Sequence, residues 1–279
     1  MGKVLSLHTM MEGDRFRWER GVWDKELCRE LAAARAVILP RSVERELYAL
    51  CRQLCPRVFP NYDLRFQWEG KVGDSLLFWT YDVPHPRTMV FPRVETLVGE
   101  HPAMDHHPPS LPEFPFLLKA ARGGEGRHLW LIANQEELQQ TLDMLLLRER
   151  SMTCGFVIQE FLPGLDRDLR IAVIGDQLIS YWRRQPENFL HNLAQGGEID
   201  ADSDPELQEA GRQAVRELCK KTGINLAGFD LVFPAGSTRP LFLEINYTFG
   251  WTGLGGAEGF SNLLRKAVDQ WLAQIPDTP

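Results

Sequence analysis

Cysteine is scarce in this sequence, and the few cysteines are scattered. An odd number without regular spacing favours reduced thiols over a disulfide framework. Cys51 and Cys55 stand four residues apart, but neither a second cysteine pair nor histidines at metal-ligand spacing accompany them. Buried or surface thiols are therefore favoured over a metal site. The five cysteines are Cys28, Cys51, Cys55, Cys154 and Cys219.

Long hydrophobic runs and excess positive charge are also missing. No apolar run approaches the ~20 residues that cross a bilayer, and Met1 to Met10 contains neither a long apolar core nor a cleavage signal. A net charge of -7 argues against a general nucleic-acid-binding surface. We therefore expect a cytoplasmic protein with no membrane and no nucleic-acid partner, in which any phosphate binding is local.

The composition is otherwise that of an ordinary globular protein. The 279 residues are 44% hydrophobic and 25% charged, which is enough for one large or two smaller domains. Alternating short apolar strands and amphipathic helices predict a small α/β unit before Asn61. A helix from Lys71 to Tyr81 follows, and Pro84 and Pro86 mark a boundary before a second unit that begins near Thr88.

Neither of the common glycine-rich nucleotide motifs is present. The loop Arg122-Gly123-Gly124-Glu125-Gly126-Arg127 lies between two apolar strands, Phe116 to Ala120 and His128 to Ile132. It lacks both the Gly-Lys-Ser/Thr of a P-loop and the Gly-x-Gly-x-x-Gly fingerprint. Its glycines could bring backbone N–H groups against phosphates, although a plain hairpin turn is the more frequent explanation. Lys119 favours the first alternative, because a lysine in an apolar strand needs a partner such as an anionic phosphate.

Two apolar strands in the last third of the chain carry side chains with oxygen ligands. Phe229 to Phe233 and Leu241 to Asn246 are separated by a seven-residue turn. Because strand residues alternate faces, Glu244 and Asn246 share one face of the second strand, and its leucines and isoleucine share the other.

Pairing of these strands would bring two acids together. The register that places Val232 opposite Phe242 also places Asp230 opposite Glu244. Facing carboxylates repel, so a cation between them is the usual explanation. Oxygen ligands without histidine or cysteine favour Mg²⁺ or Mn²⁺ over zinc. The alternative, of equal weight from these strands alone, is that both acids are solvated on an exposed sheet face.

A predicted hairpin carries further charged side chains on one face. It consists of the strands Leu169 to Ile174 and Leu178 to Arg184, and Asp168, Arg170 and Arg183 share one face of it. Arginines grouped in this way suit a carboxylate or a phosphate. The alternative is a solvated ladder of salt bridges.

An ordered series of motifs runs through the chain from the lysine-containing strand onward. The motifs are Lys119, Gly123-Gly124-Glu125-Gly126, Gln159-Glu160-Phe161, Asp168-Leu169-Arg170, Arg183-Arg184, Asn192, Asp230 and Glu244-Ile245-Asn246. Their order and spacing resemble the ATP-grasp superfamily, and most nearly its RimK-like carboxylate–amine ligases, over roughly Ala36 to Gly256. The resemblance implies an α/β (α+β) ATP-grasp fold, with two α+β lobes holding ATP between them and a shortened N-terminal α/β domain before them. The domains would be 1–62 and 63–279, the latter with a small lobe at about 88–160 and a large lobe at about 161–279.

The resemblance also implies a role for each site residue. Two lysines would contact ATP, the glycine loop would fold over its phosphates, and a strand would hydrogen-bond its adenine. Two acids with an asparagine would hold Mg²⁺ (or Mn²⁺), while two arginines and another asparagine would act on the substrate carboxylate or the transferred phosphoryl group. The cofactor-binding residues would be Lys71, Lys119, Gly123, Gly124, Gly126, Gln159, Glu160, Phe161, Leu162 and Asp168, the catalytic residues Arg170, Arg184 and Asn192, and the metal ligands Asp230, Glu244 and Asn246.

The function implied by the resemblance is that of an ATP-dependent ligase. It would activate a small-molecule carboxylate as an acyl phosphate and join it to an amine, such as an amino acid or a small peptide-like acceptor. Two alternatives stay open: an ATP-grasp kinase that phosphorylates a hydroxyl group, and a non-catalytic ATP-binding regulator. The oligomeric state is open as well, a homo-oligomer included.

The chain departs from the family pattern after Asn246. Tyr247 to Leu254 stands where the family usually has a small residue, proline and glycine. The aromatic residues there either line an acceptor pocket for a ring or an acyl chain, or pack against the sheet.

Overall fold

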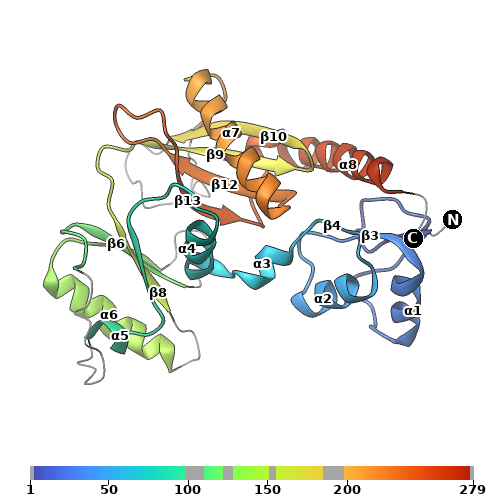
Figure 1. Ribbon diagram of the computed structural model, residues 1–279, viewed down its shortest axis with the longest axis horizontal. Coiled ribbons are helices and arrows are strands. Elements are labelled where there is room, and N and C mark those ends of the chain that lie inside the picture. The colour runs from blue at the N-terminus through green and yellow to red at the C-terminus, as the bar shows by residue number, and fades with distance from the viewer. Residues whose placement is uncertain (1–2, 99–109, 122–127, 151–154, 185–197, 277–279) are drawn as a thin grey trace.

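The computed structural model describes residues 3–98, 110–121, 128–150, 155–184 and 198–276, which form three β-sheets with helices around them (Figure 1). Each sheet comes from a separate stretch of the chain. The first sheet lies at one end of the molecule, and helices α3 (Asp63–Gln67) and α4 (Gly70–Thr80) lead from it to the other two. The three sheets fall within the three predicted parts of the chain, whose boundaries remain a prediction.

The first sheet is the small α/β unit that the sequence predicts. Its strands are parallel, in the order β2-β1-β3-β4. Helix α1 begins after Asp24, whose carboxylate accepts a hydrogen bond from the Leu27 amide at 2.8 Å, as an N-cap residue does. The elements are β1 (Lys3–Ser6), β2 (Arg15–Phe16), α1 (Lys25–Ala33), β3 (Ala34–Ile38), α2 (Arg45–Leu54) and β4 (Val58–Phe59).

The second sheet is antiparallel, in the order β5-β8-β6-β7. All five residues of β6 are buried, Lys119 included, so this lysine sits in the apolar surroundings that its strand predicts. The elements are β5 (Thr88–Phe91), α5 (Glu95–Val98), β6 (Phe116–Ala120), β7 (Leu129–Ile132), α6 (Gln135–Glu149) and β8 (Phe156–Glu160).

The third sheet is the largest, in the order β11-β10-β9-β12-β13, and two long helices pack on its opposite faces. Leu169 and Ile171 of β9 join a core with Val215 of α7, whereas Ala172 of the same strand joins a core with Leu264 of α8. This division follows from the alternation of strand side chains. The elements are β9 (Arg167–Ile174), β10 (Gln177–Arg184), β11 (Glu198–Asp200), α7 (Pro205–Thr222), β12 (Leu226–Val232), β13 (Leu241–Asn246), the short 3₁₀ helix η2 (Thr252–Leu254) and α8 (Gly256–Gln274).

The pairing of β12 with β13 contains an irregularity that the sequence did not reveal. Asp230 does lie opposite Glu244, as predicted. The expected pair of Val232 with Phe242 is wrong, however, because Leu231 faces Phe242 and the register shifts after Asp230. Leu243 is the extra residue of a β-bulge, which resets the alternation of the strand. Phe242 and Ile245 are consequently both buried, at 1% and 7% exposed.

Helix α4 connects the second and third sheets through polar contacts at its first turns. The amide of Lys71 donates to the carbonyl of Ala121, just after β6, at 3.0 Å. The carboxylate of Asp74 accepts from the amide of Ile245 in β13 at 3.3 Å. The helix therefore lies against both sheets and can present side chains between them.

Three hydrophobic clusters make up the core of the described residues. One of them joins the first sheet to α8, with Phe59 and Trp271 packed at a centroid distance of 5.5 Å. The other two lie between the third sheet and α7 and within the second sheet and its helices. None of the helices in the described ranges is long and apolar enough to span a membrane.

Phe229→Ala tests the core of the third sheet. Phe229 is fully buried and packs edge-on against Phe242 at a centroid distance of 6.2 Å. Truncation removes apolar contacts and leaves a cavity, so we expect the free energy of unfolding to fall by about 3–5 kcal/mol in urea denaturation. Phe16→Ala is the control, since Phe16 is 54% exposed, and a change in it of similar size would contradict this assignment of the core.

Candidate functional site

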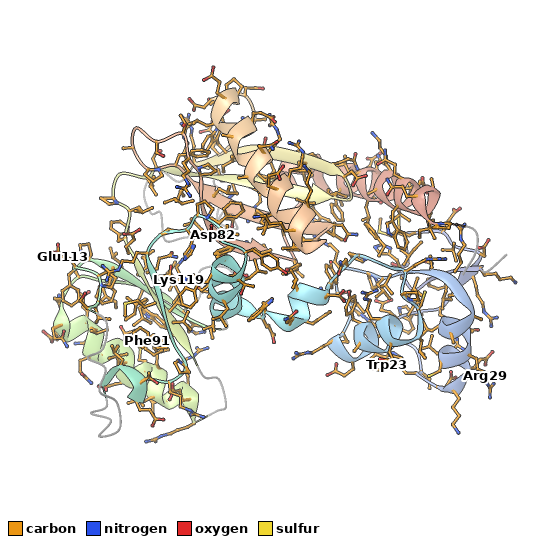
Figure 2. The ribbon with its side chains drawn as sticks, in the orientation of Figure 1. Trp23, Arg29, Asp82, Phe91, Glu113 and Lys119 are labelled. Atoms are coloured by element: carbon orange, nitrogen blue, oxygen red, sulfur yellow. The ribbon has the colours of Figure 1, made fainter. Side chains whose placement is uncertain are left out.

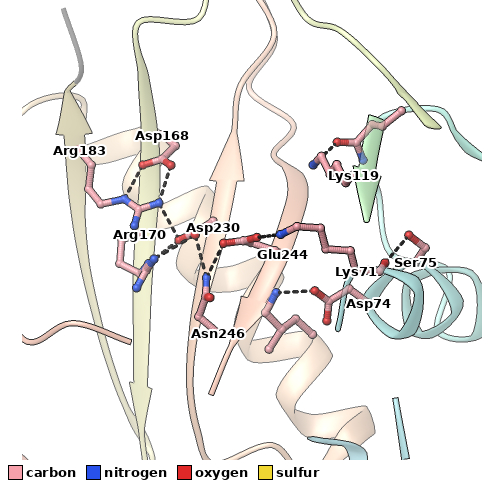
Figure 3. A network of polar contacts seen from close by, with 12 residues as sticks. Lys71, Asp74, Ser75, Lys119, Asp168, Arg170, Arg183, Asp230, Glu244 and Asn246 are labelled. Carbon is pink, nitrogen blue, oxygen red and sulfur yellow. Dashed lines mark hydrogen bonds and ion pairs between the residues drawn. The ribbon is translucent and has the colours of Figure 1, made fainter. Parts of the chain in front are cut away.

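Asp230 is the centre of a buried polar network on the third sheet (Figure 3). Arg170 on β9 and Glu244 on β13 are its directly opposed neighbours, and the three side chains meet. Arg170 Nη2 lies 3.0 Å from Asp230 Oδ2, and its Nε contacts Oδ1. Gly228 leaves room for this arginine, because a Cβ at that position would lie 3.0 Å from Arg170 Nη1. The network therefore begins as pairing between opposed strand residues.

A second arginine reaches Asp230 from β10. Arg183 Nη2 lies 3.0 Å from Asp230 Oδ1, and the same guanidinium holds Asp168 through contacts of 2.6 and 2.5 Å. Burial opposes the charge of Arg183, but Asp230 and Asp168 together raise the pKa of its guanidinium above the usual value. Burial also disfavours the charged form of Asp230 and so raises the pKa of its carboxyl group, whereas the two guanidinium groups oppose that shift. The predicted ladder of salt bridges exists, but it is not solvated, since Asp230 is 4% and Arg170 6% exposed.

Glu244 and Asn246 complete the oxygen-rich cluster predicted from the two strands. The amide nitrogen Nδ2 of Asn246 donates to Asp230 Oδ2 at 3.0 Å and to Glu244 Oε1 at 2.8 Å. Lys71 Nζ from α4 lies 3.1 Å from Glu244 Oε2. Burial favours the neutral acid, but Lys71 and the hydrogen bond from Asn246 outweigh it and hold the pKa of Glu244 far below its usual range. Glu244 is therefore ionised throughout the physiological pH range.

Lys119 approaches the network from the second sheet, on the side that faces α4 (Figures 2 and 3). Its Nζ donates to Gln159 Oε1 on β8 at 2.7 Å, and Gln159 donates in turn to Thr88 Oγ1 at 2.9 Å. Burial, with a further contribution from the charge of Lys71, lowers the pKa of Lys119 to about 8. Among the described residues Lys119 has no carboxylate within ion-pair distance, so its charge lacks a partner.

Asp74 on α4 belongs to the site although the sequence did not identify it. It is 7% exposed, and burial, followed by the charge of Glu244, raises its pKa to about 8. Its position three residues after Lys71, on the same helix face, was the available signal. Arg183 was noticed only as part of the hairpin face, and its central position follows from its register opposite Asp168.

Arg184 does not join the network. Neighbouring residues of a strand point to opposite faces, and the Arg184 side chain is 43% exposed, with its Nη2 3.4 Å from Asp200 Oδ2. Of the two consecutive arginines, Arg183 is the one that contacts the central acid.

The predicted adenine strand lies beside Lys119. Gln159 and Glu160 end β8, and Phe161 and Leu162 follow them. The amide of Glu160 donates to the carbonyl of Arg87 at 2.9 Å, and its carboxylate accepts from the Arg87 amide at 2.7 Å. The predicted residues Gly123, Gly124, Gly126 and Asn192 lie outside the described residues.

The donor set of the cluster suits a hard cation. Two carboxylates and an amide oxygen are the ligands that Mg²⁺ and Mn²⁺ prefer. Half a turn of the Asn246 amide would exchange its Nδ2 for Oδ1 and so add a third oxygen between Asp230 and Glu244. The described residues contain no group of three histidine, cysteine, aspartate or glutamate side chains placed to bind a metal, so the asparagine is needed to complete this site.

Lys71→Met tests the electrostatic coupling of the two lysines. The variant removes a neighbouring positive charge, so we expect the pKa of Lys119 to rise from about 8 towards its usual value of 10.5. Lysine Cε/Nζ resonances followed by NMR against pH would measure it, with circular dichroism to confirm folding. Lys220→Met is the matched control, because Lys220 pairs with Glu217 on the exposed surface of α7. An unchanged or lower pKa of Lys119 in Lys71→Met would contradict the coupling.

Known proteins share sequence similarity with about half of this chain. The chain is 30% identical over 149 residues to a probable alpha-L-glutamate ligase of Xanthomonas campestris, which covers 52% of this chain and 48% of that protein. It is 32% identical over 148 residues to a protein of the same name from Stenotrophomonas maltophilia, with the same coverage. The chain thus spans about half the length of the curated relatives that it matches.

Two solved structures share the fold at low sequence identity. A RimK-domain ATP-grasp protein from Sphaerobacter thermophilus superposes with a TM-score of 0.59 at 16% identity, over 95% of this chain and 98% of that one. A D-alanine–D-alanine ligase from Bacillus anthracis, solved with ATP, gives 0.60 at 14% identity, over 89% and 83%. In addition, the RimK-like ATP-grasp domain matches residues 94–263, more than half of the sequence. The chain belongs to the RimK-like ATP-grasp family.

Proposed function

We propose that this protein is an ATP-dependent ligase that activates a carboxylate as an acyl phosphate and joins it to an amine. The buried network around Asp230 and Glu244 carries the proposal, together with the family membership of the chain. Three cationic side chains and an amide converge there on two acids, and Lys119, which has no ionic partner among the described residues, faces them from the second sheet. Phosphoryl transfer needs such a collection of charges, because positioning and charge neutralisation carry most of its catalysis.

ATP would lie between the second and third sheets in this proposal. Lys119 and Lys71 project from the two sides of that region, and phosphate oxygens would supply an anionic partner that the described residues do not give Lys119. Gln159 to Leu162 would bind the adenine, the loop with Gly123, Gly124 and Gly126 would cover the phosphates, and Asp168 would hold Arg183 in place. The division into domains at 1–62 and 63–279, with the lobes at about 88–160 and 161–279, is part of the same proposal.

A magnesium ion is the cofactor that we propose with ATP. Asp230, Glu244 and Asn246 would hold it, and when bound it would neutralise phosphate charge and polarise the transferred group. Arg170 already holds one of these acids and is placed to steady negative charge that develops beside it. Arg184 and Asn192 would act on the substrate carboxylate from outside the network.

The chemistry requires no nucleophilic side chain. An oxygen of the substrate carboxylate attacks the γ-phosphorus of ATP, and ADP leaves. The amine then attacks the carbonyl carbon of the acyl phosphate, phosphate leaves, and the amine gives up a proton as the amide forms. Exclusion of water matters at the second step, because water would hydrolyse the intermediate. Use of ATP and the free thiols among the described cysteines also support a cytoplasmic location.

A substrate panel tests the reaction type. We expect phosphate release from ATP and Mg²⁺ to require both a carboxylate and an amine, with a condensed product detected by mass spectrometry. The panel should include glutamate, after the names of the curated relatives, and apolar amino acids and dipeptides. ADP formation with a stable phosphorylated hydroxyl product, and without any need for an amine, would show a kinase instead of a ligase. ATP binding without stimulated phosphate release would indicate a regulator.

Glu244→Gln tests the cation site. The variant keeps the shape of the side chain but removes a charge that holds Lys71 and would hold the metal, so we expect kcat to fall by about 10²–10³-fold while the far-ultraviolet circular dichroism stays that of the parent. Glu217→Gln on the exposed face of α7 serves as the matched control. Turnover at the parental rate in Glu244→Gln would remove the proposed metal site.

A further inference from the structure

A series of side-chain hydrogen bonds crosses the second sheet and ends at Lys119. Thr88 on β5 lies directly opposite Gln159 on β8. On the other side of β8, the residue of β6 opposite Gln159 is Leu117. Lys119 lies two positions further along β6, so it is the diagonal neighbour of Gln159 on the same face of the sheet. Three adjacent strands thus bring three polar side chains together.

The direction of each hydrogen bond in this series follows from its first member. Thr88 Oγ1 donates to the carbonyl of Pro86 at 2.7 Å, and a hydroxyl group has a single proton to donate. Towards Gln159 the same oxygen can therefore only accept, and it accepts from Nε2 at 2.9 Å. The other end of the Gln159 amide is its oxygen, Oε1, which accepts from Lys119 Nζ at 2.7 Å.

The opposite orientation of the Gln159 amide is disfavoured at both ends. Its Nε2 would face the ammonium group of Lys119, which is also only a donor, and its Oε1 would face the Thr88 oxygen, whose proton is already used. Gln159 and Lys119 are 5% and 8% exposed, so water has little access to either group. Because a buried polar group without a partner costs free energy, the orientation with Oε1 towards Lys119 is favoured.

The series is anchored on the segment between α4 and β5. The carbonyl of Pro86 lies in this segment, and two residues earlier the carbonyl of Pro84 accepts from the amide of Phe242 in β13 at 2.8 Å. The segment that fixes the Thr88 hydroxyl is therefore itself bonded to the third sheet. Lys119 is held relative to both of the sheets between which ATP is proposed to lie.

We infer that Thr88 is a positioning residue for Lys119: through the amide of Gln159 it holds the lysine ammonium group in place for the phosphates of ATP. The inference rests on the proposed ATP-dependent function, for which it names a residue outside the motifs that carry the family resemblance. Gln159 uses one of the three N–H groups of the ammonium, so two donors remain for phosphate oxygens.

Thr88→Val tests the inference on the whole chain without nucleotide. Valine keeps the shape of threonine but removes the acceptor of Gln159 Nε2, so the amide can turn its nitrogen towards Lys119. A hydrogen bond from the charged lysine to Oε1 favours the charged form. Its loss should lower the pKa of Lys119 below the parental value of about 8, measured from lysine Cε and Nζ resonances against pH. An unchanged or higher pKa would overturn the inference.

The charged groups that act on Lys119 are not altered in this variant, so a change in its pKa reports on Gln159. These groups are Lys71, Glu244, Asp74 and Asp230.

Thr88→Ser and Thr141→Val are the controls. Serine retains the hydroxyl group, so we expect it to restore the parental pKa of Lys119. Thr141 is buried on α6 and donates to the carbonyl of Glu137 at 2.8 Å, so its replacement removes a threonine hydroxyl away from the lysine and should leave the pKa unchanged. A similar fall in Thr141→Val, or no recovery in Thr88→Ser, would contradict a specific role of the Thr88 hydroxyl.

Nucleotide binding shows whether Thr88 acts through Gln159. We expect Thr88→Val to weaken the binding of ADP with Mg²⁺ about tenfold in calorimetry at pH 7. The same substitution should cause no further loss when it is added to Gln159→Leu, which removes the amide itself, because two residues that act through one contact are not additive. Additive losses would show that Thr88 acts independently of Gln159 and would overturn the inference.

The pKa of Lys119, measured without nucleotide, distinguishes this inference from the function on which it rests. A lowered pKa in Thr88→Val, in a protein that neither binds ATP nor condenses substrates, would retain the control of Lys119 by Thr88 and remove the ligase. Condensation with the same KM for ATP in Thr88→Val and in the parent would retain the ligase and overturn the inference.

Discussion

Compensation of buried carboxylate charge is the constraint on which the site and much of its surroundings depend. Asp230 is almost fully buried, and its neutralisation draws an arginine from each of two neighbouring strands. Glu244 draws Lys71 from a helix more than 170 residues away in sequence. Removing one partner of such a buried pair typically costs about 3–5 kcal/mol. Charge pairs therefore help to hold β9, β10 and α4 against the strands that carry the two acids, in addition to the apolar contacts between these elements.

Much of this arrangement was predictable, because it depends on local periodicity. Alternation along two strands placed Asp230 opposite Glu244 and put Asn246 beside them, and the structure confirms both. The bulge at Leu243 was not predictable, since the alternation of apolar and polar residues in the sequence does not show where one strand contains an extra residue. It shifted the apolar pairs while the acids stayed opposite each other.

Contacts between distant parts of the chain explain the remaining differences. The sequence placed Arg183 on one face with Asp168 and Arg170, but it did not show that this face meets Asp230, because that contact depends on the pairing of β9 with β12. Asp74 was missed because the group that donates a hydrogen bond to it is the backbone amide of Ile245, on a strand far away in the sequence. The joining of the first sheet to α8 through Phe59 and Trp271 likewise has no local signal.

The side-chain amide of Asn246 keeps the two acids bridged by hydrogen bonds. Lys71 and the two arginines supply the counter-charges, so the acids are compensated within the chain itself. If the proposed metal binds there, its loading would be an exchange of partners on a preformed scaffold, so the metal would set the activity and not the fold.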